Sequence, residues 1–230
     1  MSDTGGIIAT VTVWILPIIL AVTMHEAAHG YVARLFGDMT ASRLGRVTLN
    51  PFKHIDVFGT LVLPAVFLMG SGGSAMFGYA KPVLVDFRAL KPLRPGMVAV
   101  AIAGPGINVV LAFLSLLALR YLLEMSPTSA SWLAQNLTNS VRINISLAIL
   151  NMLPIPPLDG GRILVAILPR RLAVRVAALE GAGILILLAL IFVPRMLGEQ
   201  FGRNWDLFSV IVGVPAAWLL RALMTLVGVA

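Results

Sequence analysis

Cysteine is absent from this sequence of 230 residues, and charged residues are scarce. The lack of cysteine excludes disulfides and thiolate ligands, so a metal site could use only histidine and carboxylate side chains. Only 12% of the residues are charged, whereas 59% are hydrophobic. A soluble domain is about 25% charged and about 45–50% apolar, and a disordered chain has even fewer apolar residues. The composition therefore excludes both classes and predicts a protein of the lipid bilayer.

Acidic residues are also few, with 10 against 17 basic residues and a formal net charge of +7. The basic residues lie between apolar segments, where they set membrane topology and contact anionic lipid. No basic face interleaved with aromatic residues is visible, so nucleic-acid binding is not expected. We expect a multi-pass protein of the cell inner membrane whose first partner is the bilayer itself.

Long apolar runs predict an all-α polytopic membrane protein with five transmembrane helices, because each crossing needs about 20 apolar residues. The expected crossings are Ile7–Phe36, Val98–Leu123, Gln135–Leu153, Leu172–Val193 and Leu207–Val229. Basic loops flank the cytoplasmic ends of such helices, which places the N-terminus outside and the C-terminus inside.

Two shorter segments do not fit a full crossing. Val57–Gly70 is only about 14 residues long and has basic residues on both sides, which favours a re-entrant segment. A sixth transmembrane helix is the alternative. Phe77–Val85 has strand character and predicts a small β-hairpin near the active site.

The chemistry is concentrated in the stretch His25-Glu26-Ala27-Ala28-His29, an H-E-x-x-H pattern within an apolar segment. On a helix, residues four apart share a face, so both imidazoles can reach one zinc ion. Glu26 projects to the side of this pair, where it can accept a proton from a water activated by the metal. The alternative is a hydrogen-bonded structural cluster, but ionisable groups within a span are costly and indicate function.

A catalytic zinc needs a third protein ligand, and Asp159 is the best placed of the carboxylates. It follows a run with Pro154, Pro156 and Pro157 that breaks the preceding span. Broken helices at membrane depth occur where the backbone lines a cavity or is buried in protein. The alternative role of Asp159 is to cap the short helix that begins after it.

Three stretches of the sequence resemble the site-2 proteases, zinc metalloproteases that cleave substrates within the membrane. The first is His25–His29. The second, A-G-P-G-I-N at Ala103–Asn108, looks like the G-P-x-x-N helix of that family. The third, N-M-L-P-I-P-P-L-D-G-G-R at Asn151–Arg162, is close to the family signature N-x-x-P-x-x-P-L-D-G.

This resemblance implies a role for each matching residue. His25, His29 and Asp159 would bind one zinc ion per chain, and Glu26 would be the general base. Asn151 would lie near the metal and help to hold the substrate carbonyl.

The chain also resembles the short bacterial branch of this family. N-P-F-K-H-I-D at Asn50–Asp56 and G-Y-A-K-P-V at Gly78–Val83 look like N-P-x-x-H-I-D and G-W-A-K-P-V of that branch, with Tyr79 in place of tryptophan. Many members carry a PDZ or CBS domain, or a span before the H-E-x-x-H helix. We expect neither here, so substrate selection by such a domain is not expected.

Further candidates for substrate contact are His54, Tyr79 and Asn108. His54 is either a gate, a transient ligand or an oxyanion partner, or else a turn residue bonded to Asp56 or to the backbone. Phe77–Val85 either offers a strand edge to an unwound substrate or forms a structural hairpin.

We therefore expect one membrane-embedded metalloprotease domain over residues 1–230, with a catalytic core at about 7–168 and two further helices at about 172–229. It would hydrolyse peptide bonds in or near transmembrane segments of other membrane proteins, with its active site toward the cytoplasmic side. One alternative is a catalytically inactive metal-binding scaffold, for which Glu26 would be dispensable. The other is a transporter, which would usually show paired repeats that this sequence lacks.

Overall fold

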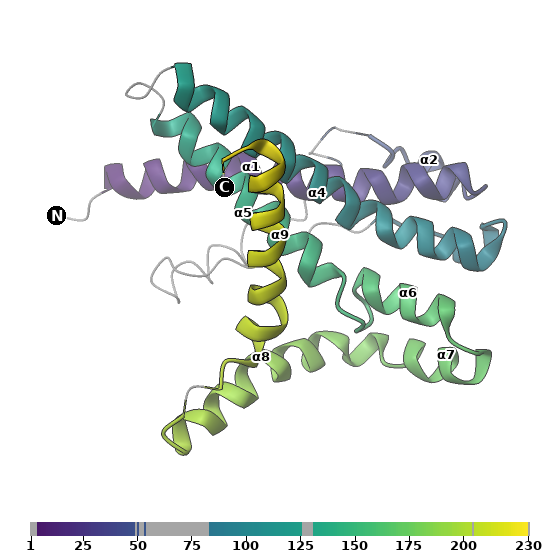
Figure 1. The fold of residues 1–230 in the computed structure, drawn as a ribbon. Helices are drawn as coiled ribbons and strands as arrows, with labels where there is room; N and C mark the ends of the chain where they lie inside the picture. Colours follow the sequence, from purple (N-terminus) through teal and green to yellow (C-terminus); the bar gives the residue numbers. More distant parts are fainter. Residues whose placement is uncertain are drawn as a thin grey trace.

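The computed structural model describes residues 4–48, 50, 53, 83–125, 131–203 and 205–229, and these residues are predominantly helical (Figure 1). Three long helices form the core: α1 (Thr4–Leu35), α4 (Leu93–Met125) and α5 (Ser131–Asn151). Each of the three packs against the other two. Pro17 and Pro105 lie inside α1 and α4, and both helices continue through them.

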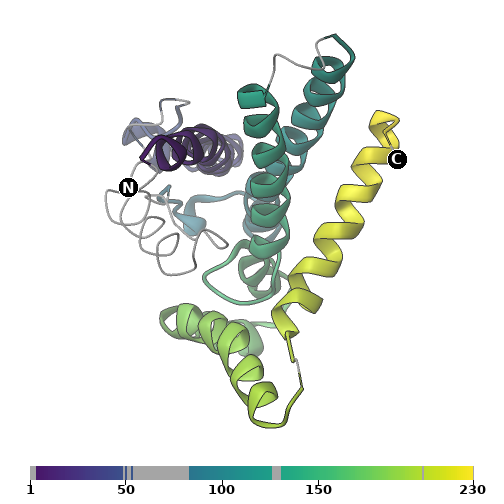
Figure 2. The same cartoon turned by 90° about the vertical axis from the view of Figure 1, so that its left-hand side faces the viewer.

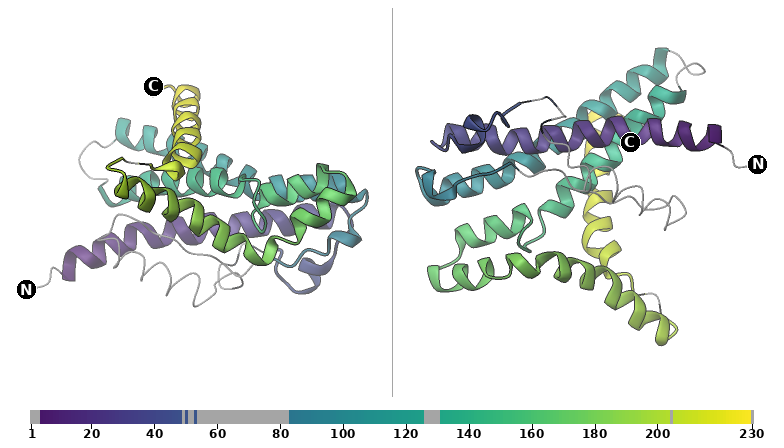
Figure 3. Two further views of the ribbon diagram at one scale, coloured as in Figure 1. Left: turned by 90° about the horizontal axis from the view of Figure 1, so that it is seen from below. Right: turned by 180° about the vertical axis from the view of Figure 1, so that it is seen from behind.

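Shorter elements complete the described part of the chain. They are α2 (Thr40–Arg43), η3 (Phe87–Ala89), α6 (Asp159–Ile167), α7 (Arg170–Ala177), η4 (Glu180–Ala182), α8 (Gly183–Gln200), the π-helical turn η5 (Ser209–Gly213) and α9 (Val214–Val227). The segment α6 packs on α4, and α6 to α8 form a run at one side of the three-helix core (Figures 1 and 3). The helix α9 lies against α4 and α5 on the side away from α1 (Figure 2).

Apolar contacts hold this arrangement together. Buried residues of α4, α5 and α9 form one cluster: Ala112, Leu116, Val141, Ile145, Leu223 and Val227. Large apolar side chains remain on the outside, for example Trp218 and Leu226 of α9, which are 72% and 74% exposed. Such a surface is stable in lipid and unusual in water. The fold is therefore that of a helical membrane protein, as the composition predicts.

The predicted number of crossings is not supported. Among the described helices, three are long and apolar enough to span a membrane: Val11–Leu35, Leu93–Leu122 and Ser209–Val227. A fourth would be Arg170–Ala182 together with Leu185–Gln200, two helices that meet at a bend of 74°.

The expected crossing at Gln135–Leu153 forms the helix α5 but does not qualify as an apolar span, because polar residues interrupt it along most of its length. Several of these are buried in the protein: Asn136, Asn139, Ser140 and Asn144. Polar side chains that face neighbouring helices are hidden from lipid. The helix α5 thus turns its buried polar residues toward α1 and α4, while Trp132 and Leu133 at its start are exposed.

The β-hairpin prediction is not supported either. No strand occurs within the part of the chain that the structure describes, and Val83–Val85 at the end of the predicted hairpin have no regular secondary structure. The rest of Phe77–Val85 and the predicted re-entrant segment Val57–Gly70 lie outside the described residues.

The end of α1 is fixed to the segment that precedes α4 by a buried carboxylate. Gly37 adopts a φ of 100°, which ends the helix. Asp38 is only 1% exposed, and its carboxylate accepts backbone N–H groups of Thr40 and Asp86 at 2.8 Å each. This link holds residues 83–86 beside α1, close to the H-E-x-x-H motif.

We expect Asp38→Ala to lower the free energy of unfolding by about 2–4 kcal/mol, because it leaves two partly buried backbone N–H groups without their charged acceptor. Asp86→Ala is the matched control. It keeps the backbone N–H that Asp38 binds and removes only an exposed bond to the amide of Arg88, at a cost of about 1 kcal/mol or less. Detergent-solubilised protein titrated with SDS and followed by tryptophan fluorescence measures both; equal losses would contradict the role of Asp38.

Candidate metal centre

His25 and His29 lie one helical turn apart on the face of α1 that packs against α4. Their side chains are buried, with exposures of 6% and 4%. The two Nε2 atoms are 3.0 Å apart, and the rings meet edge to face. The i, i+4 spacing on an apolar helix thus brings both imidazoles to one point.

Asp159 reaches the same point from the other end of the core. The helix α5 ends at Asn151, and the proline-containing turn that follows leads to Asp159 as the first residue of α6. A Cβ at Gly160 would collide with the carbonyl oxygens of Met152 and Leu153, so glycine is required for this tight return of the chain. The Asp159 carboxylate does not cap α6, whose N-cap residue is Leu158 and has no side-chain cap bond.

The three side chains converge on one small volume. Oδ2 of Asp159 lies 3.2 Å from Nε2 of His25 and 3.3 Å from Nε2 of His29. The same oxygen is buried and accepts no hydrogen bond. Oδ1 of Asp159 faces Arg162, whose Nη1 is 3.7 Å away. A buried carboxylate oxygen without a hydrogen-bond donor is costly, and a cation ligand fits such an oxygen.

The tautomers of both histidines follow from their other ring nitrogens. Nδ1 of His29 lies 2.7 Å from the carbonyl oxygen of Val100, which can only accept, so this nitrogen carries the proton. Nδ1 of His25 lies 2.5 Å from Oδ1 of Asn108 and is the donor for the same reason. Both Nε2 atoms therefore present lone pairs toward each other and toward Asp159.

This arrangement fits a tetrahedral zinc ion. Ligand atoms at about 2.0–2.1 Å from one ion, at tetrahedral angles, lie about 3.3 Å apart. The three ligand-to-ligand distances of 3.0, 3.2 and 3.3 Å are close to that value. His25, His29 and Asp159 form the cluster of potential metal ligands found among the described residues. Two histidines and a carboxylate leave the fourth position for water or substrate, as in catalytic zinc sites.

The helix α4 covers this cluster at Gly104. A Cβ at this position would lie 2.5 Å from Nε2 of His25 and 2.5 Å from Nε2 of His29. Glycine is the residue type that leaves room for an ion between the rings and α4. The G-P-x-x-N motif therefore contributes both a close approach at Gly104 and a hydrogen bond at Asn108.

Glu26 is partly buried and points toward the chain segment before α4. Its Oε2 accepts the backbone N–H of Val83 at 2.7 Å. Val83 is the last residue of the G-Y-A-K-P-V stretch, and this residue lies beside the H-E-x-x-H helix. The sequence offers no signal for this contact, because the donor is a backbone group.

The other predicted site residues are placed as follows. Asn151 is partly buried and donates from Nδ2 to the carbonyl oxygen of Leu147 in its own helix, at 3.0 Å. Asn108, for which substrate contact is predicted, is fully buried, and its Oδ1 lies 2.5 Å from Nδ1 of His25. His54 and Tyr79 lie outside the described residues. Val100, which binds His29 through its carbonyl oxygen, was not predicted because its side chain carries no signal.

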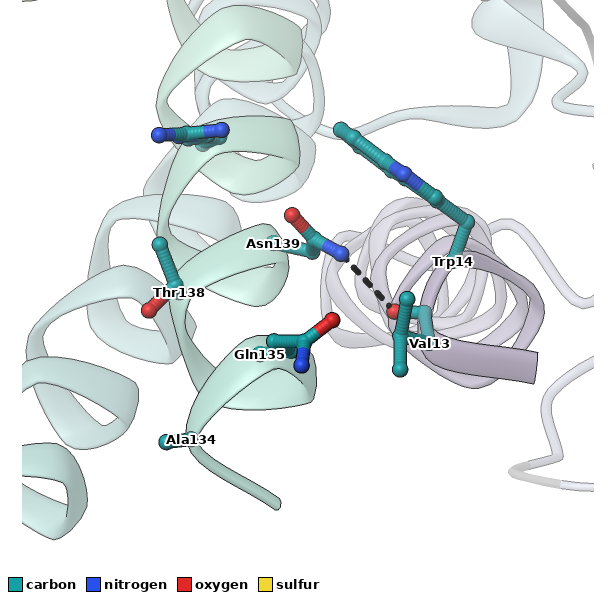
Figure 4. A pocket seen from close by; sticks show the side chains of 7 residues that line it. Val13, Trp14, Ala134, Gln135, Thr138 and Asn139 are labelled. Carbon is teal, nitrogen blue, oxygen red and sulfur yellow. Dashed lines mark hydrogen bonds between the residues drawn. The ribbon is translucent and has the colours of Figure 1, made fainter. Parts of the chain in front are cut away.

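A separate hollow of about 370 Å³ lies between α1 and α5, nearer the start of both helices (Figure 4). Its lining residues are Val13, Trp14, Ala134, Gln135, Thr138, Asn139 and Arg142. Asn139 donates from Nδ2 to the carbonyl oxygen of Val13 at 3.1 Å, as the dashed line in Figure 4 marks. Val13 precedes His25 by 12 residues, about 18 Å along the helix, so this hollow is not part of the metal centre.

Comparison with known proteins agrees with the site. The model of peptidase family M50 matches residues 13–142 and 124–193. The chain is 38% identical over 184 residues to "Putative zinc metalloprotease YwhC" of Bacillus subtilis (strain 168), covering 78% of this chain and 80% of that protein. It is 28% identical over 214 residues to "Putative zinc metalloprotease Rip2" of Mycobacterium tuberculosis (strain ATCC 25618 / H37Rv), covering 91% of this chain and 76% of that protein. No solved structure gives a significant match. The chain therefore belongs to peptidase family M50, the site-2 protease family.

Proposed function

We propose that this protein is a zinc endopeptidase that hydrolyses peptide bonds in or near transmembrane segments of other membrane proteins. The observation that carries the proposal is the convergence of two imidazole lone pairs and an unpaired carboxylate oxygen inside a helical membrane protein. Membership of a peptidase family and the zinc metalloprotease relatives support the same chemistry.

The position of the cluster in α1 supports cleavage within the membrane. His25 lies 14 residues into the candidate span Val11–Leu35, about 21 Å from its start and about 15 Å from its end. The hydrocarbon core of a bilayer is about 30 Å thick, so the ligands lie inside it. Arg34 lies at the near end of the span, and Arg43 and Arg46 follow it, which favours an active site toward the cytoplasmic side of the inner membrane.

The side chains of the site divide the work. We assign Nε2 of His25, Nε2 of His29 and Oδ2 of Asp159 as the zinc ligands, which bind one ion per chain. When bound, zinc polarises a carbonyl oxygen and lowers the pKa of water toward about 7. Glu26 then accepts a proton as general base and returns it to the leaving amine. Its Oε2 is held by Val83, so Oε1 is assigned the proton transfer.

Asn151 is assigned to the substrate carbonyl. Its side-chain amide carries two N–H groups, and one of them is used by the carbonyl oxygen of Leu147. The second can donate to the oxygen on which negative charge develops. Residues 1–230 would act as one membrane-embedded domain. The assigned site residues lie on α1, α5 and α6, and the helices after α6 would stabilise this catalytic core.

The proposal is tested with the protein purified in detergent. We expect about one zinc ion per chain by mass spectrometry of metals and zinc-dependent cleavage of a single-span substrate peptide. The chelator 1,10-phenanthroline should lower the rate at least about tenfold, and added zinc should restore it, because the ion is required for the chemistry. The non-chelating isomer 1,7-phenanthroline is the control. Absence of stoichiometric zinc, or cleavage that chelation leaves unchanged, would overturn the proposal.

A further inference from the structure

A chain of buried amides lies behind the metal centre, outside the H-E-x-x-H and L-D-G motifs. Asn108 of α4 is 0% exposed and Asn144 of α5 is 1% exposed, which makes them among the most completely buried side chains described. They link α4 and α5 to His25 on α1. Buried amides are costly unless all their groups are paired, so the pairing can be followed group by group.

The pairing begins at a backbone carbonyl that can only accept. Nδ2 of Asn144 donates to the carbonyl oxygen of Ser140 at 2.8 Å, one turn earlier in α5. This fixes the orientation of the Asn144 amide, so its Oδ1 faces Asn108. Nδ2 of Asn108 donates to that oxygen at 2.7 Å and to the carbonyl oxygen of Ala21 at 3.3 Å.

Because both N–H groups of Asn108 are directed at acceptors, its Oδ1 is left for His25. That oxygen lies 2.5 Å from Nδ1 of His25 and requires a proton on this nitrogen. Every other orientation of the two amides would set two acceptors or two donors against each other in a buried site. The carbonyl oxygen of Ser140 thus fixes the orientation of Asn144, and Asn144 fixes that of Asn108. Asn108 in turn requires the proton on Nδ1 of His25, which leaves Nε2 free to bind a metal.

We propose that Asn144 is a positioning residue that acts through Asn108 to hold His25 in the tautomer with a proton on Nδ1 and a free lone pair on Nε2. The hydrogen bonds of Asn144 go to Asn108 and Ser140, and none goes to His25, His29 or Asp159. This inference rests on the proposed function, because it takes Nε2 of His25 to be a zinc ligand. Partners beyond the direct ligands fix the tautomer of metal-binding histidines and contribute to metal affinity.

The tautomer can be read directly in zinc-free protein. We expect nitrogen-15 NMR of histidine-labelled protein at pH 8 to show His25 protonated on Nδ1, with its signals assigned by comparison with His25→Gln. In Asn144→Leu the Asn108 amide loses its 2.7 Å acceptor and keeps only the 3.3 Å bond to the carbonyl oxygen of Ala21, so its orientation is held more weakly and Nδ2 can turn toward His25. The proton should then move to Nε2, where Asp159 can accept it, and zinc affinity should fall about tenfold.

Two variants separate positioning from general destabilisation. Asn144→Asp, kept neutral in this apolar site, can donate its hydroxyl to Ser140 and accept from Asn108, so it should restore both the tautomer and the zinc affinity. Asn139→Leu is the matched control, because Asn139 is also buried on α5 and donates to a carbonyl of α1, at Val13, without contact to Asn108. It should leave both readouts unchanged.

The results that overturn the inference differ from those that overturn the zinc site. An Nε2–H tautomer in zinc-free wild-type protein would refute it even if no variant could be purified. So would an Asn144→Leu protein that keeps the wild-type tautomer and binds zinc within twofold of wild type. If wild-type protein bound no zinc, the proposed function would fail, whereas the tautomer would still be measured in the zinc-free state.

Discussion

Glu26→Gln is expected to keep its zinc and to lose cleavage by at least about 10³-fold. General acid–base catalysis contributes about 10²–10⁴-fold to a rate, and an amide cannot accept the proton that a carboxylate accepts. The assigned zinc ligands are all on other residues, so metal content should not change. The fold should not change either, because the amide oxygen of glutamine can still accept the N–H of Val83.

The measurement combines metal content, melting temperature and cleavage of a single-span substrate for wild type and Glu26→Gln. A matched control is Glu180→Gln, which removes an exposed carboxylate in η4. If Glu180→Gln cleaves at the wild-type rate and Glu26→Gln does not cleave, the alternative of a catalytically inactive metal-binding scaffold is excluded, because Glu26 would be dispensable in a scaffold. Cleavage by Glu26→Gln within tenfold of wild type would remove Glu26 from its assigned role.

Local sequence spacing predicts which residues the structure brings together in the candidate metal centre. His25 and His29 are four residues apart on a helix, and helix geometry alone brings their rings together. Asp159 follows a proline-rich break, and the structure places its carboxylate 3.2 Å from His25. In both cases the signal is a residue type at a fixed offset from a local backbone feature.

The contacts behind the ligands could not be predicted in the same way. The carbonyl of Val100 and the amide of Val83 are backbone groups, and every residue has them. Asn144 is one of several polar residues in its helix, and only its neighbours show that it is the one bonded to Asn108, the partner of His25. Tertiary packing, not sequence spacing, selects these partners.

The same polar residues explain why α5 does not qualify as an apolar span. The sequence predicts a crossing at Gln135–Leu153, but the buried asparagines of α5 need partners on α1 and α4. Hydropathy measures how well a segment tolerates lipid, whereas the position of a helix depends on where its polar groups find hydrogen bonds.

Gly104→Ala is expected to weaken zinc binding more than about 100-fold and to abolish cleavage, although it removes no ligand. The added methyl would lie 2.5 Å from Nε2 of both His25 and His29, well inside normal contact distance. Either the imidazoles or α4 must move, and a metal site tolerates displacements of only about 0.5 Å. Zinc affinity measured by competition with a chromogenic chelator gives the size of the effect.

Gly106→Ala is the matched control, two residues further along the same helix. A Cβ at Gly106 meets no atom within 4 Å, so this substitution adds a methyl without a collision. Alanine favours the interior of a helix over glycine by about 0.5–1 kcal/mol, and both variants share this gain. We therefore expect Gly106→Ala to bind zinc and cleave like wild type, with an equal or higher melting temperature. Equal zinc affinities for the two variants would mean that the metal does not sit between the histidine rings and α4, and the assigned ligand set would have to be replaced.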